Sequence, residues 1–153
     1  MNFPILSSLI LLPVIGSLFL LFSKDKNSNT GKYVALFTSF VNFLISVYLW
    51  YQFDPTTSDF QFVEDREWLK GFINYKVGID GISILFIVLT SLITPLCIIS
   101  VNNTVKDRLR DFLIAILVME SLMIGVFCSL DLVIFYLFFE AGLIPMFLII
   151  GIW

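Results

Sequence analysis

The sequence has 153 residues, of which 59% are hydrophobic and only 14% are charged. Soluble domains carry about 45–50% apolar and about 25% charged residues, so this composition is typical of a membrane protein. The net charge of -3 argues against a nucleic-acid partner, and the absence of histidine, with Cys97 and Cys128 set in apolar stretches, argues against zinc, haem or iron–sulfur sites.

Five apolar stretches are long enough to cross the hydrocarbon core, which takes about 20 helical residues. We predict helices over residues 3–22, 33–53, 82–101, 112–130 and 132–153, forming a single all-α membrane domain. Period-two alternation is missing, which argues against a membrane β-barrel. The first stretch is predicted to be a retained span, because its positive charges follow the apolar run instead of preceding it.

The connections differ in charge, and this predicts the orientation. Residues 23–32 and 102–111 each carry three basic side chains in ten residues, whereas the longer connection 54–80 is rich in acids. By the positive-inside rule the two basic connections face the cytoplasm, the N-terminus lies outside and the C-terminus is cytoplasmic. Trp50, Tyr51 and Trp68 are expected at the membrane interface. The segment 64–72, EDREWLKGF, is expected to form a short amphipathic surface helix.

Two acids lie inside predicted spans, and these are the candidate functional residues. Glu120 and Glu140 each lie about ten residues from the turn at 130–131, so both are expected at ~15 Å from it, near the membrane midplane. A charge there costs about 2.5–3.5 kcal/mol on insertion scales. Either carboxyl group is suited to accept and release a proton. The alternative is a permanently protonated acid, bonded to a serine, a threonine or a backbone carbonyl.

Several other residues have local interpretations. Asp80 and Asp131 are expected to cap the third and fifth helices. Pro95 and Pro145 are expected to free the carbonyls of Ser91 and Ala141 within their helices. The basic cluster at 106–110 is read as a topology signal. The last apolar run ends at Trp153 without a polar tail, so we expect a fragment or a truncated gene product.

Three stretches resemble one known family. They are GIDGIS at 78–83, LTSLITPLCI at 89–98 and MESLMIGVFCSLDLVIFYLFFEAGLIPMFLIIGIW at 119–153. They resemble the antiporter-like chain M of NADH:ubiquinone oxidoreductase, respiratory complex I, whose mitochondrial counterpart is chain 4. The resemblance implies the N-terminal part of a fold of about fourteen helices with two inverted repeats. It also implies that Glu140 matches the helix-five glutamate of a proton channel, which pairs there with a lysine from a later helix.

The resemblance implies a function within a complex of several subunits. We expect a proton-translocating subunit of the membrane arm, in a bacterial cell membrane or the mitochondrial inner membrane. Its partners would be the lipid bilayer and other membrane-arm subunits of complex I. NADH and quinone would be used by the parent complex, with no cofactor or redox site in this chain. The alternatives are a subunit of a multisubunit cation/proton antiporter and a non-catalytic structural remnant of the complex.

Overall fold

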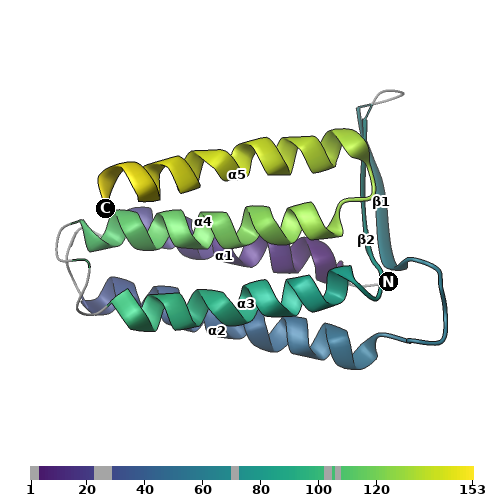
Figure 1. The fold of residues 1–153 in the computed structure, drawn as a ribbon, viewed down its shortest axis with the longest axis horizontal. Coiled ribbons are helices and arrows are strands. Elements are labelled where there is room, and N and C mark those ends of the chain that lie inside the picture. The colour runs from purple at the N-terminus through teal and green to yellow at the C-terminus, as the bar shows by residue number, and fades with distance from the viewer. Residues whose placement is uncertain (1–3, 23–28, 70–72, 102–104, 106–107) are drawn as a thin grey trace.

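A computed structural model of the chain describes residues 4–22, 29–69, 73–101, 105 and 108–153. Five helices run side by side in a bundle, with a β-hairpin across one end (Figure 1). They are α1 (Ile5–Phe22), α2 (Asn29–Gln52), α3 (Ser83–Ser100), α4 (Leu109–Cys128) and α5 (Leu132–Ile152). Each is long and apolar enough to cross a membrane, so the prediction of five spans is confirmed. The largest shift is at α2, which begins at Asn29 instead of residue 33.

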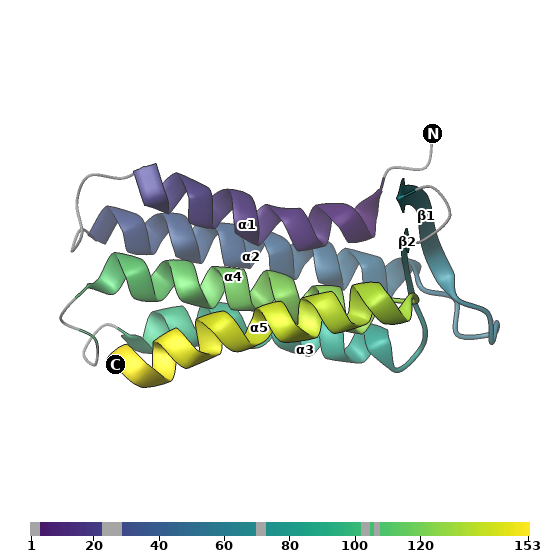
Figure 2. The same cartoon turned by 90° about the horizontal axis from the view of Figure 1, so that it is seen from above.

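The helix α4 lies in the middle of the bundle and contacts each of the other four helices. Two groups of buried aliphatic side chains fill the interior. One surrounds Leu9, Leu49, Ile87 and Ile124, and the other surrounds Leu20 and Leu117. The helix α5 is at the edge of the bundle, where it packs on α4 (Figure 2). It buries 11% of its spanning residues, against 28–44% for the other four helices.

The two ends of the bundle agree with the prediction that the basic connections lie on one side of the membrane and the acidic connection on the other. The start of α1, the hairpin and the turn between α4 and α5 lie at one end (Figure 1). The end of α1, the start of α2, the end of α3, the start of α4 and the C-terminus lie at the other end. Trp50 and Tyr51 are exposed where α2 reaches the hairpin end, as expected of interfacial aromatics. The side chain of Trp68 is outside the described part of the chain.

The segment predicted as a surface helix is instead part of a β-hairpin. Strand β1 (Gln61–Leu69) pairs antiparallel with β2 (Ile73–Ile79), and residues 70–72 lie outside the described residues. The prediction was wrong because it weighed only the local amphipathic pattern of 64–72. The following segment, INYKVGI, is rich in residues that favour strands, and pairing with it determines the conformation of both segments.

Hydrogen bonds fasten the hairpin to the bundle at two places. The Glu64 carboxylate accepts from the backbone N–H groups of Leu6 at 2.9 Å and Ser7 at 3.3 Å, and from the Ser7 hydroxyl. These amides belong to the first turn of α1, which has no intrahelical partners for them. At the second place, on β2, the Leu130 N–H donates to the Lys76 carbonyl at 3.0 Å. The hairpin therefore joins the start of α1 to the turn between α4 and α5.

The predicted Asp131 cap is confirmed, and Asp80 accepts a backbone hydrogen bond from the first residue of α3, although the residue directly before that helix is Ile82. The Asp80 carboxylate accepts from the Ser83 N–H at 2.7 Å, while the Asp80 N–H donates to the Ser83 hydroxyl at 2.8 Å. This reciprocal pair is a capping box at the start of α3. The bonds from Ser83 hold the pKa of Asp80 below its usual value. The Asp131 carboxylate accepts from the N–H groups of Val133 and Ile134 and caps α5.

Candidate functional site

The buried acid Glu120 lies on the inner face of α4 and points into the bundle. Its side chain is 2% exposed, and Asn42 of α2 is fully buried beside it. The Asn42 amide nitrogen donates to Glu120 Oε1 at 2.9 Å. The two residues are 78 positions apart in the sequence, so only the packing of α2 against α4 brings them together. The predicted partner of a buried glutamate was a hydroxyl or a backbone carbonyl, and the structure gives a side-chain amide instead.

Other buried polar side chains continue from this pair and link the four inner helices. The hydroxyls of Ser46 on α2 and Ser91 on α3 are 2.7 Å apart. Ser121, next to Glu120, donates to the Ile10 carbonyl of α1 at 2.5 Å. We call these five residues, Asn42, Ser46, Ser91, Glu120 and Ser121, the polar seam. It crosses the interior of the bundle and contains one acidic side chain.

The polar seam adjoins a small pocket between α3 and α4. The pocket has a volume of about 240 Å³, and its lining includes Glu120, Thr90, Thr94 and Cys97. Thr94 is almost fully buried. The hydroxyls of Thr90 and Thr94 donate to carbonyls one turn earlier in their own helix, so they are already bonded. Glu120 is the acidic group of this pocket.

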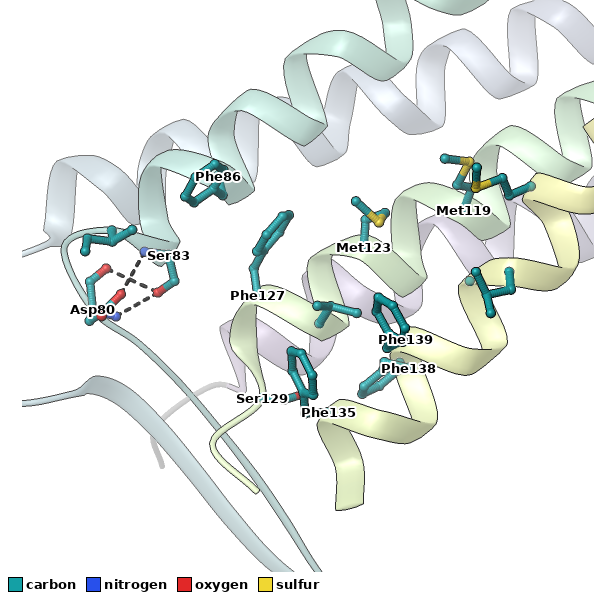
Figure 3. A pocket seen from close by; sticks show the side chains of 15 residues that line it. Asp80, Ser83, Phe86, Met119, Met123, Phe127, Ser129, Phe135, Phe138 and Phe139 are labelled. Carbon is teal, nitrogen blue, oxygen red and sulfur yellow. Dashed lines mark hydrogen bonds between the residues drawn. The ribbon is translucent and has the colours of Figure 1, made fainter. Parts of the chain in front are cut away.

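A larger apolar groove begins where that pocket ends. Met119 and Met123 line both cavities, and the groove continues between α3, α4 and α5 with a volume of about 660 Å³ (Figure 3). Aromatic rings form much of its wall, including Phe86 and Phe127, whose stacked rings have centroids 5.1 Å apart. The Asp80–Ser83 capping box lies at the hairpin end of the groove (Figure 3).

The second predicted acid, Glu140, has the opposite environment. It is exposed on the outer face of α5, where it interacts with Tyr136, one turn earlier in the helix. The shallow depression around it is lined entirely by residues of α5. Glu120 and Glu140 therefore do not face each other in the described chain. Pro145 lies inside α5 without ending the helix, as Pro95 does in α3.

Sequence reasoning found both acids and missed Asn42. A signal for Asn42 was present, since an amide in the middle of an apolar span needs a hydrogen-bond partner inside the protein. The sequence does not say which helix supplies that partner. The two prolines were singled out for the carbonyls they free. The structure connects one of them, Pro95, with the polar seam, because Ser91 lies one turn before it and bonds Ser46.

Comparison with known proteins gives long and close matches. The chain is 47% identical to NADH-ubiquinone oxidoreductase chain 4 of Marchantia polymorpha over 97% of its own length and 30% of the relative. It is 57% identical to NADH-quinone oxidoreductase subunit M of Rhodobacter capsulatus over 84% of the chain and 24% of the relative. For subunit M of Rickettsia prowazekii the identity is 43%, over 100% of the chain and 32% of the relative.

No family model matches the chain. The chain spans about 30% of the length of the curated relatives it matches. The five apolar helices agree with a membrane subunit. The chain is therefore a homologue, over nearly all its residues, of one part of NADH-quinone oxidoreductase subunit M and of NADH-ubiquinone oxidoreductase chain 4.

Proposed function

We propose that this chain forms the first five helices of a proton-translocating membrane-arm subunit of respiratory complex I. In this proposal Glu140 is the principal proton-bearing group and Glu120 is a second one. The relatives named as NADH-quinone oxidoreductase subunits support the assignment to that complex. The other membrane-arm subunits are the proposed partners, and NADH and quinone react elsewhere in the complex.

The observation that carries the proposal is the position of Glu140. Its carboxyl group lies on the outer face of α5, where the surrounding depression is lined by apolar side chains and Tyr136 is one turn away. If lipid covered that face, a charged carboxylate would cost about 2.5–3.5 kcal/mol. Protein or water covering the same face would remove most of this cost and let the group exchange protons. The chain spans about 30% of its relatives, which leaves ample sequence in those proteins to cover α5.

The orientation follows from the charges of the connections. With the hairpin end of the bundle on the outer side of the membrane, the C-terminal end of α5 is cytoplasmic. Glu140 then lies between the two surfaces, about eight residues from the start of its helix at Leu132. A proton reaching it from either side would have to travel along the exposed face of α5. This face is therefore the proposed boundary between the chain and the remaining helices of the subunit.

The test is a Glu140→Gln substitution in the assembled complex. Electron transfer from NADH and proton uptake are measured together in inverted membrane vesicles. We expect fewer protons per electron, because glutamine keeps the shape of the side chain and removes its proton. Glu140→Asp is the matched control, since it retains a carboxyl group and should retain part of the transport. An unchanged proton-to-electron ratio in Glu140→Gln vesicles with normal amounts of the chain would instead favour a purely structural subunit.

A further inference from the structure

The Glu120–Asn42 pair leaves two buried oxygens with unused hydrogen-bonding capacity. Within the described residues, Glu120 Oε2 and Asn42 Oδ1 are buried side-chain atoms that have no hydrogen-bond partner. Both belong to groups that are already joined through the 2.9 Å bond from the amide nitrogen to Oε1. When the carboxyl group is ionised, both leftover atoms are acceptors and neither can satisfy the other. Buried polar atoms are almost always paired, so these two oxygens call for a proton or another donor.

A metal cation does not fit this place well. Hard cations take about six to eight oxygen ligands, and this pair offers two. The nearby hydroxyls already donate hydrogen bonds to backbone carbonyls: Ser46 to Phe43 at 2.7 Å, and Ser121 to Ile10. A single proton needs only the two atoms that are present. On Oε2 it turns that oxygen into a donor, and Asn42 Oδ1 is an acceptor on the group already bonded to Glu120.

The charged groups around Glu120 do not supply an alternative. The helix α1 has no ionisable side chain, and α3 has only the thiol of Cys97, which lines the same pocket. The ionisable groups of α2 are Lys32 near its start and three exposed tyrosines. The other ionisable groups of α4 lie near its two ends, and Tyr136 and Glu140 of α5 are exposed on its outer face. No cation of the described helices is therefore placed beside the Glu120 carboxyl group.

We propose that Glu120 and Asn42 form a proton-binding site that fastens α2 to α4. With the proton bound, acid and amide make two reciprocal hydrogen bonds: Asn42 Nδ2–H to Oε1, and Oε2–H to Asn42 Oδ1. When the proton leaves, the second bond is lost and two acceptor oxygens face each other between the helices. Release of the proton therefore loosens the contact between α2 and α4, and rebinding restores it.

This site differs from Glu140 in what controls it. Glu140 is exposed on the outer face of α5, whereas Glu120 is 2% exposed and is bonded to Asn42 of this chain. The inference rests on the proposed function only for the use of the proton, which would couple protonation to movement of α2 against α4. The existence of the bound proton is independent of transport and can be tested with the chain itself.

The test is infrared spectroscopy of the purified chain in lipid nanodiscs at pH 7. The carbonyl stretch of a protonated carboxylic acid is distinct from the bands of a carboxylate. Spectra are compared for the unaltered chain, Glu120→Gln, Glu140→Gln and the double variant. We expect a protonated-acid band that persists in Glu140→Gln and is lost in Glu120→Gln. A folded chain in which Glu120→Gln removes no such band overturns the proposal, even if Glu140 proves essential for pumping.

Two further variants test the role of the amide. Asn42→Leu should move the Glu120 band to the higher frequency of a carbonyl without hydrogen bonds, while Ser46→Ala, one turn along the same helix, should leave it in place. Glu120→Gln should keep α2 on α4, because two amides can form the same reciprocal pair. A band that keeps its frequency in folded Asn42→Leu shows that Asn42 is not the partner and refutes the site. If Asn42→Leu does not fold, asparagine amides in the unaltered chain are labelled with nitrogen-15 instead. A shift of the Glu120 band then supports Asn42 as the partner, and an unshifted band refutes the site.

Discussion

Replacing Glu64 by alanine should release the start of α1 from the hairpin. The carboxylate accepts from two backbone amides of the first helical turn and from the Ser7 hydroxyl. Loss of a helix N-cap costs about 0.5–2 kcal/mol, and hydrogen bonds to charged groups are worth about 1.5–3 kcal/mol each. Water can reach part of this site, so we take a value near the top of the capping range, about 2 kcal/mol. This corresponds to about a 30-fold rise in local opening.

Hydrogen exchange measured by mass spectrometry, with the chain in nanodiscs, follows this opening directly. The amides of Leu6 and Ser7 should exchange about 30-fold faster in Glu64→Ala than in the unaltered chain. Glu64→Gln keeps one acceptor oxygen and should show roughly half the change in free energy, about 1 kcal/mol. The later turns of α1 should keep their protection, because their bonds are intrahelical.

The neighbouring acid provides the matched control. Asp65 is on the same strand and lies 3.9 Å from Lys76, and both side chains are about half exposed. Exposed ion pairs of this kind contribute about 0–1 kcal/mol. Asp65→Asn should therefore leave the exchange of Leu6 and Ser7 unchanged. Equal acceleration in Asp65→Asn and Glu64→Ala would show that general loosening of the hairpin is responsible, and the argument for a specific cap would fail.

Two more substitutions test the packing and the capping of the helices. In Gly125→Ala the new methyl group would lie 2.7 Å from the ring of Phe138, so thermal unfolding in detergent should show a stability loss of about 1–3 kcal/mol. Gly142→Ala is the control: there is open space around Gly142, so this substitution should be neutral or stabilising. Equal effects of the two substitutions would contradict this packing. Asp80→Ala should cost about 0.5–2 kcal/mol. Because the bonds from Ser83 lower the pKa of Asp80, its stabilisation should be complete above about pH 4 and fade as the pH falls through its folded-state pKa. An acid titration of the unfolding transition that is the same in Asp80→Ala would exclude this contribution.

The spans and caps were predictable from sequence because their signals are local. A helix that crosses a membrane needs an apolar run of fixed length, and all five runs were recognised from that requirement. A cap needs an aspartate directly before the run, as at Asp80 and Asp131. The hairpin was missed because strand formation at 61–69 depends on pairing with 73–79, and a local helical pattern gives no information about such a partner.

The environments of the two acids could not be predicted for a different reason. In a soluble bundle, polar residues mark the outer face of each helix, so the inner face can be read from the sequence. In a membrane both faces are apolar, and α4 and α5 offer no comparable contrast. The position of Glu120 against Asn42, and that of Glu140 on the outer face, follow from tertiary packing alone.

The opposite placement of the acids separates what this chain can do alone from what, on the proposed function, needs other helices and subunits. Within the described spans, the helices α1, α2 and α3 contain no acid and α4 turns its mid-span acid inward, so α5 alone presents a mid-span carboxyl group outward. On our proposals, the role of Glu140 depends on groups that cover α5 from outside the chain, while that of Glu120 depends on Asn42 and the packing of α2 on α4. It follows that changes at Glu120 should be measurable in the isolated chain, whereas the full effect of Glu140→Gln should emerge only after assembly.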